Sequence, residues 1–262
     1  MAAHSEAIDI LVDEEHIAGT FLTPPPRMPG VLFVHGWGGS QQRDLERARG
    51  IAGLGCVCLS FDLRGHGQTF AQQQTVTREQ NLNDVLAAYD MLAAHPHIDP
   101  AAIAVVGTSY GGYLAALLTG LRPVKWLALR VPALYRDEDW AVPKRQLDRA
   151  VLNELRTSRV LPTENRALAA CARFEGDVLL VESEKDHLVP HQTIMNYRAA
   201  FQKTHSLTHR IIFGADHALS HERCQEAYTS ILVNWTTEMV IGARLHERSA
   251  GGFRPVGEPP PD

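Results

Sequence analysis

The chain has 262 residues, of which 45% are hydrophobic and 21% are charged, and its formal net charge is −5. This composition is ordinary for a soluble globular protein, and a large α/β sheet can use the whole length as one domain. Without a basic tract to neutralise phosphates, nucleic-acid binding has little support. No apolar run reaches the ~18 residues that a membrane span requires, so we expect no membrane-spanning segment.

The amino terminus and the cysteines bear on the compartment of the protein. Residues 1–16 lack a basic start and an uninterrupted apolar core, and so differ from a signal peptide. The four cysteines lack the paired spacing of a zinc site, and we interpret them as reduced thiols. The sequence therefore predicts a cytoplasmic protein with no metal site and no cofactor.

Two alternating segments, Ala7–Val12 and His16–Leu22, open the chain and predict an antiparallel hairpin. Three prolines at positions 24–26 end this hairpin, because residues without an N–H cannot continue a ladder. Apolar strand patterns then alternate with helical patterns along the rest of the chain. The expected strands are Val31–Val34, Cys56–Phe61, Ile103–Val106, Trp126–Val131, Val178–Val181 and Leu207–Phe213.

Strands that alternate with helices require crossover connections, which produce a mostly parallel sheet with helices on both faces. We therefore expect an α/β protein with a sheet of about eight strands and an antiparallel start. Residues 1–247 are expected to form a single domain. Residues 248–262 are rich in glycine and proline and are expected to form a flexible tail.

One connection is longer than a simple crossover needs. About 46 residues separate the strand patterns 126–131 and 178–181. An amphipathic pattern within about 134–162 predicts a small helical cap, in which Tyr135 and Trp140 are candidates for contacting a substrate. The alternative is a helix that packs against the edge of the sheet.

The most informative stretch is Gly107-Thr108-Ser109-Tyr110-Gly111, a Gly-x-Ser-x-Gly pattern between a strand pattern and a helix pattern. A serine at such a sharp turn is held in a strained conformation that lifts its hydroxyl clear of the sheet. The two glycines leave room for the strand and the helix to approach closely. We therefore predict that Ser109 is a nucleophile.

A serine hydroxyl needs a neutral imidazole to take its proton and a carboxylate to orient that imidazole. Asp186 and His217 follow the last two strand patterns, so both are expected at the edge of the sheet that carries Ser109. His221 lies one helical turn later and competes for the role of base. Three nearby carboxylates compete with Asp186, namely Glu182, Glu184 and Asp216.

These motifs resemble those of the α/β-hydrolase superfamily, and within it the cytosolic esterase, serine aminopeptidase-like and dienelactone hydrolase-like branches. The resemblance covers roughly residues 8–245. Residues 35–39 look like the oxyanion loop of the superfamily, and residues 62–67 look like its D-x-R-G-H-G turn. Residues 184–190 and 214–217 are similar to its acid and histidine loops.

The resemblance implies an α/β-hydrolase fold in which Ser109, His217 and Asp186 form a catalytic triad. It favours these residues over their competitors because they match the motifs of the superfamily position by position. It further implies an oxyanion hole formed by the backbone N–H groups of Trp37 and Tyr110.

The predicted function is a serine hydrolase that cleaves carboxylic esters of small to medium size through an acyl-enzyme. An aminopeptidase or amidase, an acyltransferase, and a non-catalytic ligand-binding protein of the same fold stay open as alternatives. A small-molecule ester is the expected partner, and a homodimer is compatible with the sequence. A dinucleotide site is not expected, because Gln41 stands where the pattern G-x-G-x-x-G requires its last glycine.

Overall fold

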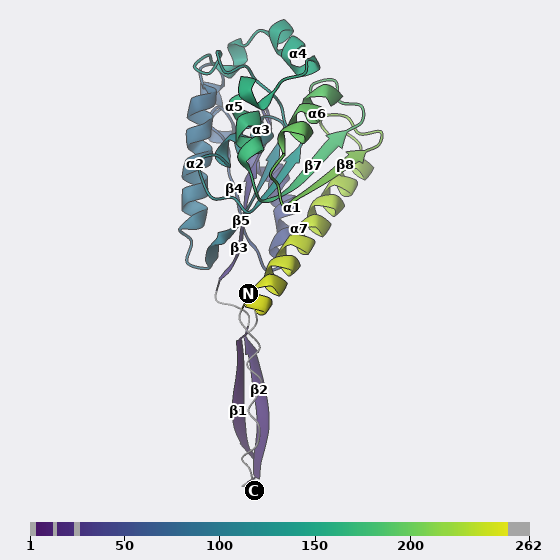
Figure 1. Cartoon of the computed structure of the whole chain (residues 1–262). Helices are drawn as coiled ribbons and strands as arrows, with labels where there is room; N and C mark the ends of the chain where they lie inside the picture. Colours follow the sequence, from purple (N-terminus) through teal and green to yellow (C-terminus); the bar gives the residue numbers. More distant parts are fainter. Residues whose placement is uncertain (1–3, 13–14, 24–26, 251–262) are drawn as a thin grey trace.

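The structure is a computed structural model that describes residues 4–12, 15–23 and 27–250. Its main element is a six-stranded parallel sheet with the strand order β4-β3-β5-β6-β7-β8 (Figure 1). The strands are β3 Met28–Val34, β4 Val57–Ser60, β5 Ile98–Thr108, β6 Trp126–Arg130, β7 Asp177–Ser183 and β8 Ser206–Ile212. The alternation of strands and helices therefore predicted the α/β class correctly.

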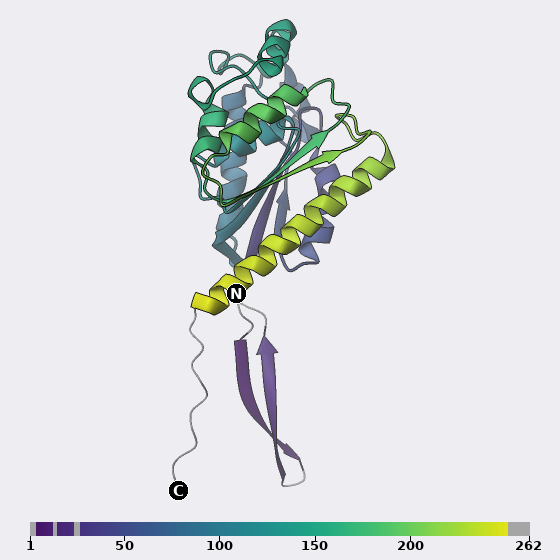
Figure 2. The same cartoon turned by 45° about the vertical axis from the view of Figure 1, so that its right-hand side comes forward.

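Helices cover both faces of this sheet (Figure 2). They are α1 Gln41–Ala52, α2 Arg78–Ala93, α3 Tyr110–Leu118, α5 Arg166–Arg173, α6 His191–Ala200 and α7 Glu222–Ala250. Successive side chains of a strand point to opposite faces. Leu32 and Val34 of β3 accordingly belong to the core that α2, α3, α5 and α6 complete, whereas Val31 and Phe33 belong to the core that α1 and α7 complete.

The prediction of an eight-stranded sheet is wrong in one respect, because the first two strands form a sheet of their own. β1 His4–Val12 and β2 Glu15–Thr23 pair antiparallel, as their alternating pattern predicted, and lie apart from the parallel sheet (Figure 1). The strands of a hairpin satisfy backbone groups of each other. Prolines 24–26 cannot donate to a ladder and separate the hairpin from β3 along the chain. The hairpin therefore adds no strand to the parallel sheet, whose edge strands are β4 and β8.

Between β6 and β7 lies the segment that the sequence predicted as a cap. It contains the helix α4 Arg149–Thr157 and the short 3-10 helices η2 Lys144–Gln146 and η3 Pro162–Glu164. The side chain of Asp148 begins α4 by accepting from two N–H groups of its first turn. In Figure 1, α4 lies at the end of the molecule to which the carboxyl ends of the strands point. A further 3-10 helix, η1 Gly67–Gln74, follows β4.

The carboxyl-terminal helix bears on the predicted tail at 248–262. Helix α7 includes the first three residues of that range, and residues 251–262 lie outside the described residues. The single domain over residues 1–247 stays a prediction. Within the described part of the chain, no helix is long and apolar enough to cross a membrane.

Candidate active site

Ser109 lies at a sharp turn between β5 and α3. Its backbone has φ 52° and ψ −111°, which is strained for a residue other than glycine. Such a conformation persists where surrounding contacts hold it. The Ser109 N–H donates to the Arg130 carbonyl at 2.8 Å, and the Ser109 carbonyl accepts from the N–H groups of Tyr113 and Ala133 at 3.1 and 3.0 Å. The backbone of the serine is therefore fixed from three sides.

The two glycines of the pattern make this turn sterically feasible. A Cβ atom at Gly111 would lie 2.0 Å from the Val34 carbonyl oxygen. A Cβ atom at Gly107 would lie 2.6 Å from the Gly111 carbonyl oxygen. A side chain at either position would therefore push α3 away from the sheet. The geometry is the strand–turn–helix arrangement that the pattern predicted.

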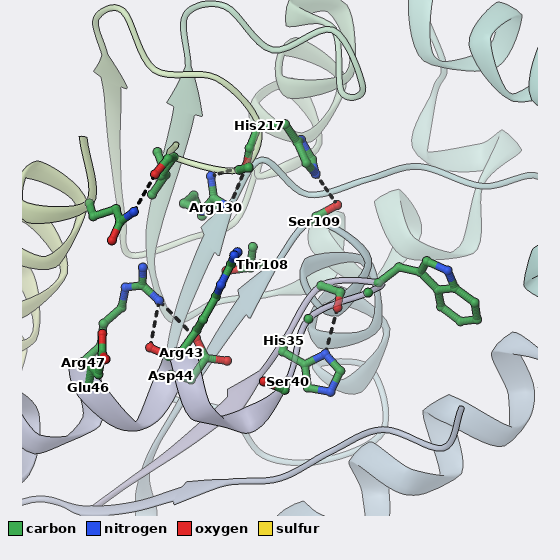
Figure 3. A pocket seen from close by; sticks show the side chains of 17 residues that line it. His35, Ser40, Arg43, Asp44, Glu46, Arg47, Thr108, Ser109, Arg130 and His217 are labelled. Atoms are coloured by element: carbon green, nitrogen blue, oxygen red, sulfur yellow. Dashed lines mark hydrogen bonds and ion pairs between the residues drawn. The ribbon is translucent and has the colours of Figure 1, made fainter. Parts of the chain in front are cut away.

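Three side chains from distant parts of the chain meet beside this turn. His217 Nε2 lies 3.0 Å from Ser109 Oγ (Figure 3), and His217 Nδ1 lies 2.6 Å from Asp186 Oδ2. An ionised carboxylate only accepts hydrogen bonds, so Nδ1 carries the proton and Nε2 is free to accept from the serine hydroxyl. Asp186 Oδ1 accepts from the N–H groups of Leu188 and Val189, each at 2.8 Å. The structure thus brings together the three side chains that the sequence singled out.

Arg130, which sequence analysis did not single out, holds the loop that carries His217. It is the last residue of β6, and its Nη1 and Nη2 atoms both donate to the His217 carbonyl at 3.0 Å. Only 6% of the residue is exposed, and burial lowers the pKa of its guanidinium. A buried charge persists where it is hydrogen-bonded, so Arg130 positions the backbone behind the imidazole. An arginine at the end of an apolar strand pattern is a signal that could have found it.

The loop after β3 packs against the serine turn. A Cβ atom at Gly36 would lie 3.2 Å from the Thr108 carbonyl oxygen and 3.4 Å from Ser109 Cβ. His66 Nε2 accepts from the Gly38 N–H at 3.0 Å, and burial lowers the pKa of this histidine. A neutral His66 is the form that can accept this bond. The turn after β4 therefore braces the loop after β3.

Trp37 lies in that loop, and Tyr110 is the first residue of α3. Among the described residues, neither backbone N–H donates to a protein acceptor. Free N–H groups beside a nucleophile are what a developing oxyanion requires. The indole of Trp37 packs edge-on against the Tyr110 ring, with 5.4 Å between the ring centroids. Its side chain is therefore a packing element, and the role of the two N–H groups stays a prediction.

Tyr135 and Trp140, the aromatic residues predicted to contact a substrate, lie elsewhere. Tyr135 is 2% exposed and packs edge-on against Tyr110, with 5.6 Å between the ring centroids. The centroid of the Trp140 ring lies 4.3 Å from the guanidinium carbon of Arg166. Trp140 lines a separate cavity beside α3 and α5. The structure does not bring either ring into the pocket of Ser109, and a substrate contact for them stays a prediction.

A pocket of about 200 Å³ opens beside Ser109 and His217 (Figure 3). It lies between the loop after β3, the first turns of α1, the end of β6 and the loop that carries His217. The competing histidine, His221, does not line it. Among the described residues, no group of three or more His, Cys, Asp or Glu side chains is placed to hold a metal ion. The pocket therefore offers a hydroxyl, an imidazole and charged side chains for chemistry.

Comparison with known proteins identifies a family and a fold for this chain. The model of the prolyl oligopeptidase family matches residues 45–242, which contain the serine turn and the acid and histidine loops. The esterase Est1E from Butyrivibrio proteoclasticus superposes with a TM-score of 0.62 at 17% identity, over 90% of this chain and 96% of that chain. This likeness shows the fold, which is that of the α/β-hydrolase superfamily.

The relatives that are similar in sequence include the following two. An uncharacterized protein of Mycobacterium tuberculosis is 33% identical over 163 residues, which cover 62% of this chain and 54% of that protein. The mitochondrial palmitoyl-protein thioesterase ABHD10 of Homo sapiens is 25% identical over 194 residues, which cover 64% of this chain and 60% of that protein. The chain therefore spans less than two thirds of the length of each.

Proposed function

The chain belongs to the prolyl oligopeptidase family, and from this premise we propose that it is a serine hydrolase that cleaves carboxylic esters of small to medium size. A hydrolase with the α/β-hydrolase fold is the coarser description, and it follows from the family and the fold. The observation that carries the finer proposal is the unbroken path of hydrogen bonds from Asp186 through His217 to Ser109. In this path a neutral imidazole can donate to the carboxylate from Nδ1 and accept the serine proton at Nε2.

In the first step, Ser109 Oγ attacks the carbonyl carbon of the ester while His217 Nε2 takes the hydroxyl proton. The carboxylate of Asp186 stabilises the imidazolium that forms. The carbonyl oxygen becomes an oxyanion, and we propose that the N–H groups of Trp37 and Tyr110 bind it. A donor of this kind is worth about 3 kcal/mol in the transition state.

The tetrahedral intermediate then collapses. The bond between the acyl carbon and the leaving oxygen breaks, and His217 returns its proton to that oxygen, so that an alcohol departs and an acyl group stays on Ser109. Water attacks this acyl group while His217 again takes a proton. The carboxylic acid leaves, and the serine hydroxyl is restored.

The size of the pocket supports small acyl groups, because about 200 Å³ is below the range of pockets that enclose drug-sized ligands. The name of the family supports a second candidate, the cleavage of amide bonds by the same three residues. Amide cleavage requires protonation of a poorer leaving group, which His217 would supply in the same position.

A panel of 4-nitrophenyl esters and aminoacyl 4-nitroanilides, assayed with the wild-type protein and Ser109→Ala, tests the proposal. We expect the wild type to cleave the short-chain esters fastest, and the variant to lose about 10³-fold or more of this activity. A fluorophosphonate probe should label the wild type and not the variant. Ester turnover that survives in Ser109→Ala would refute the proposal, and faster cleavage of the anilides would favour the second candidate.

A further inference from the structure

The pocket beside Ser109 carries an excess of positive charge. Five charged side chains line it, and they are Arg43, Arg47, Arg130, Asp44 and Glu46. The whole chain has a formal net charge of −5, so a cationic pocket runs against the overall balance. Local charge of one sign in a pocket favours a ligand of the other sign.

Two of the three arginines already have partners within the protein. Arg130 donates to the His217 carbonyl, as described above. Arg47 Nη1 lies 3.5 Å from Asp44 Oδ1 and donates to the Arg43 carbonyl at 3.2 Å. Asp44 is buried, and burial raises the pKa of its carboxyl group. The carboxylate of Asp44 is therefore paired with Arg47, and it is protonated more readily than an exposed carboxylate.

The guanidinium of Arg43 has no such partner. Within the described part of the chain, it makes no ion pair and no side-chain hydrogen bond, with Glu46 or with any other acceptor. Figure 3 shows its side chain rising from α1 into the pocket, toward Thr108. Arg43 also lies in the first turn of α1, where the helix dipole disfavours a cation. A bound anion would offset this local cost.

We propose that Arg43 binds a carboxylate at the far end of the acyl chain, so that the enzyme selects hemiesters of short dicarboxylic acids. The inference rests on the proposed function, since it names the substrate class of the same site. Arg43, Thr108 and Ser109 line the same pocket of about 200 Å³, so one short chain can place its anionic end at Arg43 and its acyl carbon at Ser109. A guanidinium suits this role because its planar fork matches a carboxylate.

Hydrolysis of monoethyl succinate and of ethyl butanoate tests the proposal, because the two acyl chains have equal length and differ in charge. In each reaction, Ser109 Oγ takes the acyl group while the bond to the ethoxy oxygen breaks and ethanol leaves, and water then cleaves the acyl-serine bond to release the acid. We expect the wild type to have the higher kcat/KM for monoethyl succinate. Arg43→Gln should lower the ratio of kcat/KM for monoethyl succinate to kcat/KM for ethyl butanoate about tenfold, mainly by raising KM for the anionic ester. Arg49→Gln removes an exposed arginine of α1 outside the pocket and should leave the ratio unchanged.

Calorimetry with Ser109→Ala measures binding without turnover. We expect this variant to bind monoethyl succinate more tightly than ethyl butanoate, and Ser109→Ala with Arg43→Gln to lose that preference. If anion binding depends on Arg43 but the wild type cleaves neither ester, the proposed function fails and the anion site stands. If the wild type cleaves both esters and Arg43→Gln leaves their ratio unchanged, the proposed function stands and the anion site is refuted.

Discussion

Replacing Arg130 by methionine would remove the support of the loop that carries His217. Methionine is similar in length and fits an apolar strand, but it has no donor for the His217 carbonyl, which now accepts at 3.0 Å from both Nη atoms. Arg130 is buried, so water cannot simply replace the lost donors. The loop should therefore relax, and the imidazole should leave its position 3.0 Å from Ser109 Oγ for part of the time.

The magnitude follows from the kind of bond that is lost. Hydrogen bonds that involve a charged group are worth about 1.5–3 kcal/mol. If this free energy is lost, the equilibrium of the loop shifts away from the conformation that places His217 beside Ser109. Since 1.36 kcal/mol is a factor of ten, kcat should fall about 10- to 150-fold. The free energy of unfolding should change less, since removal of Arg130 also relieves the cost of burying a charge.

The assay is kcat for 4-nitrophenyl butyrate, measured beside a thermal unfolding curve. Arg130→Lys keeps a charged donor and should lose less activity than Arg130→Met. Arg122→Met removes a partly exposed arginine that pairs with Asp90 far from the loop of His217, and it serves as the control. The reasoning is refuted if Arg130→Met retains kcat within threefold of the wild type while Ser109→Ala is inactive.

Three further comparisons of variants test the rest of the site. Asp186→Asn should lower kcat about 10³-fold or more through the wrong histidine tautomer, and Glu184→Gln should not; the reverse order in a hydrolysis assay would move the acid to Glu184. Trp37→Pro should lose about 3 kcal/mol of transition-state stabilisation that Trp37→Ala keeps, and equal kcat/KM losses would contradict a role for the N–H. Gly111→Ala should unfold well below the wild type in a thermal melt, because its Cβ would lie 2.0 Å from a carbonyl oxygen; an unchanged Tm would disprove this packing argument.

The parts of the site that the sequence predicted depend on local rules. The Gly-x-Ser-x-Gly pattern specifies a turn within five residues, so the positive φ of Ser109 and the close packing at Gly111 could be expected before any fold was known. Asp186 and His217 could be placed because each follows a strand pattern, and parallel strands bring their carboxyl ends to one edge. Choosing them over the competing carboxylates and over His221 also needed the resemblance to the superfamily.

The features that escaped prediction depend on contacts between distant residues. An arginine at the end of a strand pattern marks Arg130 as unusual, but its partner His217 is 87 positions away, and the local sequence does not identify that partner. The hairpin shows the same alternation whether it joins the sheet or stands alone, so its pairing partner could not be inferred from the pattern. The local sequence around Tyr135 does not show whether its ring lines a pocket or packs in the core. In the structure the ring packs against Tyr110, which is far away in sequence, and lies in the core.

Lys144 of the cap segment allows a prediction about pH and stability. Its Nζ atom lies 4.2 Å from the centroid of the Trp37 ring and 5.2 Å from that of Tyr110. Burial, followed by repulsion from Arg156 and Arg145, lowers the pKa of this lysine from 10.5 to about 7. Below pH 7 the folded and unfolded chains both hold the proton, and the folded chain bears the cost of a partly buried charge. Between pH 7 and 10.5 only the unfolded chain holds it, so the stability of the wild type rises with pH.

Lys144→Met removes this charge, and the variant should therefore be more stable than the wild type at pH 6. The difference should shrink by about 1–3 kcal/mol between pH 7 and 9, where the upper value is two pKa units at 1.36 kcal/mol and the lower value allows for solvent screening. Urea unfolding of both proteins at pH 6, 7 and 9 measures this difference. Lys203→Met, at an exposed position, should show no such trend. If the difference in free energy of unfolding between Lys144→Met and the wild type stays constant over this range, the folded lysine keeps its proton. The three aromatic rings around Nζ would then stabilise the charge more than burial disfavours it.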